Sequence, residues 1–214
     1  MLQHLVGDNK IFYTSLKSDS MFENLSKYQI VLASNSPRRK ELLQHLGLDF
    51  KVRTLLGVDE SYPAHLKGED IAKYISAVKA NAYKSTMANN ELLITADTIV
   101  CAHNGEILGK PVDKNDATRM LQLLSGKTHK VITGVCIMTS ERTELFAVNT
   151  EVKFAEITNN EINFYIDRYL PYDKAGSYGI QEWIGLIAVE EIHGSFFNVM
   201  GLPIQRLYKV LNTF

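Results

Sequence analysis

The fold class of this chain is decided by the stretch YQIVLASNSPRRKELLQHLG (residues 28–47). Its first part, YQIVLAS, is a short apolar run of the kind that forms a buried strand. Its second part predicts a helix, because Pro37 suits the first helical turn, three leucines form one apolar stripe, and Gly47 suits the position after a helix end. A strand that passes through a turn into a helix indicates an α/β architecture.

The same alternation of strand and helix patterns continues toward the C-terminus. Strands are predicted in three apolar runs, at residues 92–101, 129–139 and 144–154. Helices are predicted in four segments with apolar stripes, within residues 68–87, 113–124, 159–168 and 202–211. No internal repeat, low-complexity tract or Pro/Ser linker divides the chain, so we expect one α/β domain. If this domain has two lobes, they follow from the topology of its strands and helices and not from a visible boundary in the sequence.

The N-terminal segment differs from this domain. Residues 1–27 carry scattered apolar positions without a clear period, and we interpret them as an N-terminal extension to a domain that spans 28–214. Met21 is a second possible start just before the first predicted strand. We therefore hypothesise that residues 1–20 are dispensable for folding and activity.

Composition limits the classes of partner and compartment. The 214 residues are 45% hydrophobic, enough for one core or two small lobes. The formal net charge of -1 offers no general cationic surface for nucleic acid, and no apolar run is long enough to span a bilayer. Two distant cysteines, Cys101 and Cys136, provide neither a metal knuckle nor a disulfide scaffold. We expect a soluble cytoplasmic protein that binds neither nucleic acid nor membrane.

The first candidate site is SNSPRRK (34–40), where the first strand gives way to the helix. A helix N-terminus offers unpaired backbone N–H groups and a partial positive charge. Ser34 and Ser36 add hydroxyl donors, while Arg38 and Arg39 add planar guanidinium groups that suit phosphate oxygens. The segment predicts a polyphosphate-binding loop. The alternative is that Ser36 only caps the helix and the basic run is a solvated face.

The second candidate is Asp97, which interrupts the apolar run LLITADTIVC (92–101). A carboxylate is costly to bury unpaired, so one in such a run lies at a strand end, contacts a metal or another cation, or acts as an acid or base. Together with Glu60 it has the oxygen ligands to hold a divalent cation, with phosphate oxygens completing the shell. Thr98 is expected on the opposite face if the strand continues, whereas a bend would bring it into the site, and both alternatives stay open at this point.

Two lysines and two glycine-containing segments complete the candidates. Lys79 lies on the flank of a helical apolar stripe and Lys110 lies in the loop GKP (109–111). Either lysine alone is an ordinary surface charge, so their interest depends on their meeting in one cleft. Gln181 ends the segment DKAGSYGIQ (173–181), and its amide both donates and accepts, as reading a base edge requires. The glycines of this segment and of GSFFNVMGLP (194–203) permit close approach of the backbone to a ligand, and the alternative is that the two segments are ordinary turns.

Several catalytic signatures are absent from the sequence. The histidines form no HExxH or i,i+4 pair, which argues against a zinc hydrolase. There is no GxSxG motif for a nucleophilic serine and no GxxxxGK[ST] loop of the Walker A type.

Taken in order, six motifs resemble the motif series of the Maf family of nucleotide pyrophosphatases. They are ASNSPRRKELL (33–43), ADTIV (96–100), GKP (109–111), ITGV (132–135), AGSYGIQ (175–181) and GSFFNVMGLP (194–203). The resemblance covers about residues 28–212. It implies a Maf- and inosine-triphosphatase-like α/β fold, with two lobes around an elongated mixed sheet and a central cleft. It also implies a divalent metal, Mg²⁺ or Mn²⁺, and a homodimer.

The resemblance also assigns roles to residues of this chain. It implies that Asp97 is the proton acceptor and that Glu60 and Asp97 lie at the metal. The positions that bind phosphate fall on Ser34, Ser36, Arg38, Arg39, Lys79 and Lys110. The implied reaction is hydrolysis of a nucleoside triphosphate to the monophosphate and pyrophosphate.

Three selectivity positions resemble the branch of the family that acts on dTTP and UTP, namely Arg38, Thr98 and Gln181. The branch that acts on 7-methyl-GTP has an aromatic residue in place of Arg38 and a glutamine in place of Thr98. One departure is Glu182-Trp183, since relatives more often have a small residue directly after the glutamine. The resemblance thus favours pyrimidine nucleotides.

Three other functions remain open at this point. The first is a pyrophosphatase for 7-methyl-GTP or another non-standard nucleotide. The second is a non-catalytic, nucleotide-binding regulator of cell division, and the third is a phosphatase that releases orthophosphate. A nucleotide panel assayed for pyrophosphate separates them.

Overall fold

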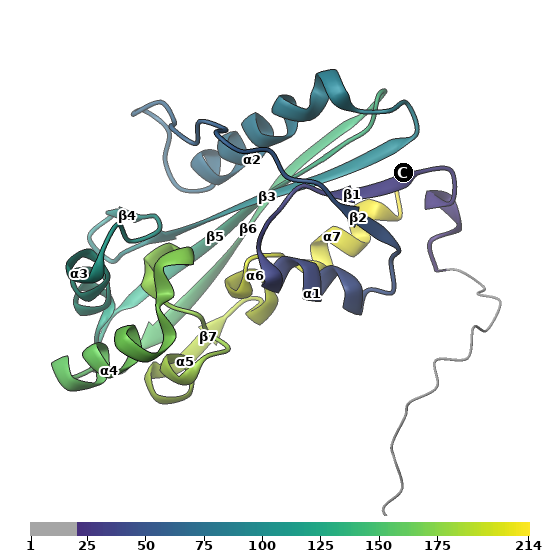
Figure 1. Cartoon of the computed structure of the whole chain (residues 1–214). Coiled ribbons are helices and arrows are strands. Elements are labelled where there is room, and N and C mark those ends of the chain that lie inside the picture. Colours follow the sequence, from purple (N-terminus) through teal and green to yellow (C-terminus); the bar gives the residue numbers. More distant parts are fainter. Residues whose placement is uncertain (1–20) are drawn as a thin grey trace, which may run out of the picture.

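The computed structural model describes residues 21–214 (Figure 1). A seven-stranded sheet forms its centre, in the order β2-β1-β3-β5-β6-β7 with β4 paired to β3. The strands are β1 (Gln29–Leu32), β2 (Phe50–Val52), β3 (Glu91–Cys101), β4 (Ile107–Leu108), β5 (Thr128–Met138), β6 (Thr143–Phe154) and β7 (Val189–His193). The α-helices are α1 (Pro37–His45), α2 (Glu69–Tyr83), α3 (Lys114–Leu124), α4 (Asn159–Tyr169), α5 (Trp183–Ala188), α6 (Phe196–Met200) and α7 (Ile204–Leu211). Short 3₁₀ helices are η1 (Glu23–Leu25), η2 (Lys84–Thr86), η3 (Pro171–Asp173) and η4 (Ala175–Ser177).

The sheet is mixed, which confirms the α/β class. β1 runs parallel to both β2 and β3, and α1 and α2 are the helices of these two crossovers. β3, β5, β6 and β7 then follow one another as antiparallel neighbours. The strand, turn and helix of residues 28–47 therefore form the first parallel crossover of the sheet.

The long predicted elements are confirmed, and their ends have local causes. The side chain of Ser36 accepts a hydrogen bond from the Arg39 N–H at the start of α1, and Pro37 occupies the first turn. Gly47 follows the C-cap with φ 74, which is the left-handed conformation of a helix stop. The sequence analysis did not predict β2, β4, β7, α5 or α6. Each spans six residues or fewer, too few to show a period.

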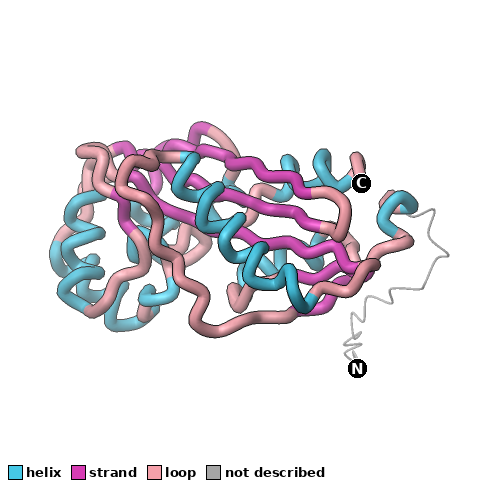
Figure 2. The backbone as a smooth tube through the Cα atoms, turned by 90° about the horizontal axis from the view of Figure 1, so that it is seen from above, coloured by secondary structure: helices cyan, strands magenta, loops and turns pink. Residues whose placement is uncertain are grey.

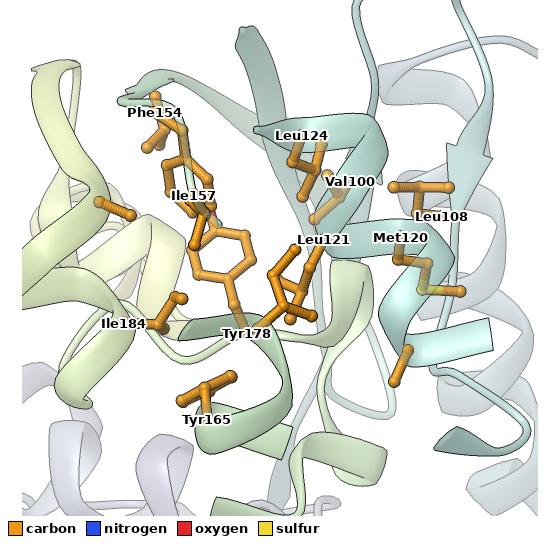
Figure 3. Close-up of a cluster of buried hydrophobic side chains, with 14 of the residues drawn as sticks. Val100, Leu108, Met120, Leu121, Leu124, Phe154, Ile157, Tyr165, Tyr178 and Ile184 are labelled. Carbon is orange, nitrogen blue, oxygen red and sulfur yellow. The ribbon is translucent and has the colours of Figure 1, made fainter. Parts of the chain in front are cut away.

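Helices lie on both faces of the sheet and gather at two ends. α2 covers one face across β3, β5 and β6 (Figure 2). Toward one end, α1 and α7 pack with β1 in a core that includes Leu32, Leu43 and Leu207. At the other end, α3, α4 and α5 enclose a second core, where Tyr165 and Tyr178 lie among aliphatic side chains (Figure 3). These are the two lobes that the resemblance implies.

Residues 21–27, grouped with the N-terminal extension in the sequence analysis, pack against the domain. Leu25 is 3% exposed within the core of the α1–α7 end. Asn24 Nδ2 donates to the carbonyl of Leu211 at 2.8 Å, and the Phe22 and Tyr208 rings meet edge to face at 5.6 Å. These contacts place residues 22–25 in the folded body rather than in an extension. Residues 1–20 lie outside the described residues.

The dispensability of residues 1–20 stays a prediction. A protein that begins at Met21 keeps the contacts of Phe22, Asn24 and Leu25, so we expect its Tm to change by less than about 2 °C. Its nucleotide turnover is expected to equal that of the full chain. Thermal melts and steady-state kinetics of the two proteins check this, and a large loss of Tm or of activity would contradict it.

Candidate active site

The candidate site lies where part of the β3 edge has no neighbouring strand. β1 pairs with β3 only over Glu91–Ile94, and β4 pairs with it only at Val100–Cys101. Between these two ladders, at residues 95–99, the edge of β3 borders a cleft of about 330 Å³. The start of α1, the side of α2 and the segment 173–181 form its other walls.

All the residues that the sequence analysis assigned to a site line this one cleft. They are Ser34, Ser36, Arg38, Arg39, Glu60, Lys79, Asp97, Thr98, Lys110 and Gln181. Convergence of the two lysines, on which their interest depended, is thus confirmed. The individual roles of these residues stay predictions.

Asp97 and Thr98 reach the same cleft although their side chains point to opposite faces of β3. The pairing of β3 with β5 runs without a register shift from Leu93 to Cys101, so the strand does not bulge at this point. Thr98 therefore points to the opposite face, as expected for a continuous strand, and no bend is needed to bring it into the cleft. Both side chains line the cleft because it extends over both faces of the uncovered edge.

On the α2 face of β3, Lys79 bridges two carboxylates. Its Nζ lies 2.6 Å from Asp97 Oδ1 and 3.0 Å from Glu60 Oε1. The side chains of Lys79 and Asp97 are only 16% and 12% exposed, which excludes the interpretation of Lys79 as a solvated surface charge. Asp97 thus lies mid-strand and is paired with a cation, one of the three explanations that the sequence analysis offered.

Gly134 brings α2 close enough for this ion pair. It is the partner of Asp97 across the β3–β5 ladder, so it lies on the same face of the sheet. A Cβ at position 134 would lie 2.2 Å from the carbonyl oxygen of Ala72 in α2. The glycine of the ITGV motif therefore permits direct contact between helix backbone and sheet, and that contact places Lys79 beside Asp97.

On the other face, Arg39 joins three parts of the chain. Its Nε donates to the Gly201 carbonyl at 2.7 Å, and its Nη1 donates to the Ala96 carbonyl at 2.8 Å. Its Nη2 donates to Thr98 Oγ1 at 3.0 Å. Burial lowers the pKa of Arg39, and Asp97 opposes that effect. Arg39 thus uses much of its donor capacity to hold α1 and the turn after α6 on the free edge of β3.

The serines of the loop combine a structural contact with a place in the cleft. Ser36 Oγ accepts the Arg39 N–H at 3.4 Å, as the capping interpretation predicts. Ser34 Oγ accepts the Ser36 N–H at 3.2 Å. In both contacts the hydroxyl oxygen is the acceptor, so each O–H remains able to donate to a ligand.

Arg38 lines the cleft beside residues that the sequence analysis did not single out. Its Nη1 donates to Asp173 Oδ2 at 2.7 Å, and Lys174 Nζ lies 2.7 Å from Asp173 Oδ1. Burial alone would raise the pKa of Asp173, but hydrogen bonds from Lys174 and Arg38 outweigh it and lower the pKa. The segment DKAGSYGIQ attracted attention for its glycines and Gln181. The signal that could have identified Asp173 and Lys174 in the sequence is that they are an adjacent pair of opposite charges.

A buried histidine lies behind the cleft. His129 on β5 is 1% exposed, and its Nε2 lies 2.7 Å from the hydroxyl of Tyr178, a cleft-lining residue. Burial lowers the pKa of His129 from 6.5 to about 4, so the ring is neutral at pH 7. His129 is therefore a buried packing residue.

The pKa of His129 predicts a loss of stability in acid. Between pH 6.5 and about 4 the unfolded chain binds a proton at His129 that the folded chain does not, so stability falls as pH falls through this range. The difference corresponds to about 3 kcal/mol, since one pKa unit is about 1.4 kcal/mol. Urea unfolding of the wild type and of His129→Gln between pH 4 and 7 measures it. Equal pH slopes in the two proteins would contradict the assignment.

The two carboxylates of the cleft have the chemistry to hold a divalent metal ion together with a phosphate-containing ligand. Among residues 21–214, no group of three or more His, Cys, Asp or Glu side chains is placed to hold a metal ion. Glu60 and Asp97 both pair with the ammonium group of Lys79. They supply two hard oxygen donors of the kind that Mg²⁺ and Mn²⁺ bind. The rest of the coordination shell would then come from phosphate oxygens and water.

Curated relatives match almost the whole chain. It is 60% identical over 191 residues to a dTTP/UTP pyrophosphatase of Bacteroides fragilis (strain YCH46), covering 89% of this chain and 98% of that protein. A dTTP/UTP pyrophosphatase of Parabacteroides distasonis is 57% identical over 194 residues, with 91% and 100% covered. One of Porphyromonas gingivalis (strain ATCC 33277) is 52% identical over 196 residues, with 91% and 98% covered.

A solved structure and a family model complete the comparison. A HAM1 protein from Coxiella burnetii is 13% identical, with 87% of this chain and 100% of that chain covered and a TM-score of 0.47. The family model described as Maf-like protein matches residues 29–214. That span includes every strand and α-helix of the structure and every residue that lines the cleft, so this chain belongs to the Maf family.

Proposed function

We propose that this protein hydrolyses dTTP and UTP to the nucleoside monophosphate and pyrophosphate. The observation that carries the proposal is a single cleft that holds a buried carboxylate, several cationic side chains and the side-chain amide of Gln181. The names of the curated relatives support the same reaction and the same two substrates.

The charges of the cleft suit a triphosphate. Arg38 and Lys110 line the cleft with donors for phosphate oxygens, and the start of α1 adds its partial positive charge. Lys79 also lines the cleft, and its charge is balanced by Asp97 and Glu60. A Mg²⁺ or Mn²⁺ ion held by the two carboxylates would neutralise further phosphate charge when it is bound.

In the proposed reaction, water attacks the α-phosphorus. The bond from this phosphorus to the oxygen that bridges it to the β-phosphorus breaks, and pyrophosphate leaves. Asp97 accepts a proton from the attacking water. Its ion pair with Lys79 uses Oδ1, so the proton goes to Oδ2. Catalysis rests on positioning and charge stabilisation, with the proton transfer as an additional contribution.

Pyrimidine selectivity is proposed for Gln181 together with Arg38 and Thr98. Gln181 is exposed at the cleft, where its amide offers one donor group and one acceptor. Uracil and thymine present carbonyl acceptors on either side of an N–H donor, so an amide held in one orientation pairs with them. An amide free to turn would match the complementary pattern of cytosine equally well.

The experiment that tests the function is a nucleotide panel. The purified protein with Mg²⁺ or Mn²⁺ is given dTTP, UTP, CTP, GTP and 7-methyl-GTP, and pyrophosphate and orthophosphate are measured separately. We expect pyrophosphate, with dTTP and UTP the fastest substrates. Preference for 7-methyl-GTP, release of orthophosphate, or tight DNA binding without turnover would each replace the proposal with one of the alternatives named above.

The cytoplasmic location and the homodimer are also proposals. No helix within residues 21–214 is long and apolar enough to cross a membrane. Cys101 and Cys136 are free thiols, which supports the proposed cytoplasmic location. The homodimer is proposed from the family resemblance, and light scattering of the full chain in solution tests it.

A further inference from the structure

A chain of alternating charges begins on one wall of the cleft and continues behind it. It consists of Arg38, Asp173, Lys174 and Glu182, and we call it the ion-pair chain. Arg38 Nη1 lies 2.7 Å from Asp173 Oδ2, and Lys174 Nζ lies 2.7 Å from Asp173 Oδ1. The same Nζ lies 3.1 Å from Glu182 Oε1, and Glu182 Oε2 accepts a hydrogen bond from the hydroxyl of Tyr165. Two cations and two carboxylates thus alternate without excess charge.

The inner part of this chain is buried. The side chains of Lys174 and Glu182 are 8% and 20% exposed. An ammonium group in such a place is stable only when paired, and Lys174 has two carboxylates within hydrogen-bonding distance. Removing either charged partner leaves the other uncompensated, so the geometry of the segment depends on both.

Gly179 and Tyr165 complete the packing around these charges. A Cβ at position 179 would lie 2.8 Å from Glu182 Cδ and 3.0 Å from Lys174 Cε. The Gly179 N–H donates to the Tyr165 hydroxyl at 3.0 Å, and the Glu182 N–H donates to the Gly179 carbonyl at 2.9 Å. The backbone on both sides of Gln181 is therefore held by contacts of Tyr165 and Glu182, which also hydrogen-bond to each other at the inner end of the ion-pair chain.

The chain connects two of the proposed selectivity positions. Arg38 is its first member and comes from α1, while Gln181 directly precedes its last member, Glu182. Asp173 and Lys174 lie between them in space and also line the cleft. A shift at any member would move Arg38 or the backbone that carries the Gln181 amide.

We propose that Lys174 and Glu182 are positioning residues for base selection. Neither takes part in the chemical step. They hold Arg38 and the backbone that carries the Gln181 amide in one arrangement, which favours the orientation of the amide that pairs with uracil and thymine over the one that pairs with cytosine. This inference rests on the proposed dTTP and UTP activity. It adds to that activity a function for Glu182, the residue at which this chain departs from the pattern its resemblance implies.

The test uses the ratio of kcat/KM for dTTP to that for CTP. A purely structural role lowers the active fraction and affects both nucleotides equally, so it leaves the ratio unchanged. We expect Lys174→Met to lower the ratio by about 10-fold or more, mainly through KM. Glu182→Gln keeps the shape but removes one charge, and a smaller decrease is expected. An unchanged ratio in both variants overturns the proposal.

A further variant tests the proposal if Lys174→Met does not fold. Gly179→Ala forces only the outer atoms of Glu182 and Lys174 to move, so the protein is expected to fold while the dTTP-to-CTP ratio falls. The matched control is Lys153→Met. Lys153 also lies between two carboxylates, 2.9 Å from Glu190 and 3.5 Å from Glu191, but it does not line the cleft. Its ratio should equal that of the wild type.

A binding measurement separates this proposal from the proposed reaction. The Kd values of α,β-methylene analogues of dTTP and CTP do not depend on hydrolysis. If the wild type binds the thymidine analogue selectively and the variants lose that preference, positioning is supported even where no pyrophosphate forms. If the wild type binds both analogues equally, the positioning proposal fails whatever the protein hydrolyses.

Discussion

Replacing Asp97 with asparagine is expected to lower kcat for dTTP by about 10²- to 10⁴-fold, the usual contribution of a general base. The amide keeps the size of the side chain and its place on β3. It cannot accept the proton from water, and it removes one of the two negative charges beside Lys79. Steady-state pyrophosphate release by the variant and the wild type under saturating Mg²⁺ measures the effect.

The control for this variant is Asp49→Asn. Asp49 is exposed and does not line the cleft, so the same change of side chain there should leave kcat unaltered. Circular dichroism melts establish that both variants are folded. Wild-type turnover in Asp97→Asn would remove Asp97 from the reaction and leave it as the partner of Lys79 alone.

Lys79→Met is expected to lower kcat/KM for dTTP by about 10²- to 10³-fold. The loss of one group that stabilises developing charge in a transition state typically has an effect of this size. The substitution keeps an unbranched side chain on α2 but leaves Asp97 and Glu60 without their shared cation. Those two carboxylates would then repel the triphosphate as well as each other. Initial rates over a range of dTTP and Mg²⁺ concentrations measure the loss.

Lys73→Met on the same helix is the matched control. Lys73 pairs with Asp70 at 2.8 Å and lies outside the cleft lining, so its loss removes the same charge from α2 without touching the site. Equal activity losses in the two variants would mean that Lys79 acts only through the stability of α2. Rescue of Lys79→Met by higher Mg²⁺ would locate its role in balancing the two carboxylates.

Much of the site was predictable because its residues have unusual surroundings in the sequence. Asp97 stands out as the charge in an apolar run, and Ser36, Pro37 and the arginines stand at a strand-to-helix turn. Local signals of this kind depend on a few neighbouring residues. The residues they single out line one cleft, but the signals carried no information on which partner each side chain would find.

The partners were decided by tertiary structure. Arg39 donates to the carbonyl of Gly201, 162 positions away, and Arg38 pairs with Asp173, 135 positions away. Thr98 joins Asp97 in one cleft only because β1 and β4 leave the same part of the β3 edge uncovered. None of these contacts leaves a period or a cap in the sequence.

The sequence by itself determined the α/β class, the long strands and helices, and the residue types of the site, because strand and helix periods, caps and isolated charges are local properties. Only the tertiary structure decided the strand order, the position of Lys79 between Asp97 and Glu60, and the ion-pair chain from Arg38 to Glu182. The physical reason is that these contacts join distant segments. They form only where a close approach such as that of α2 to Gly134 brings two elements together.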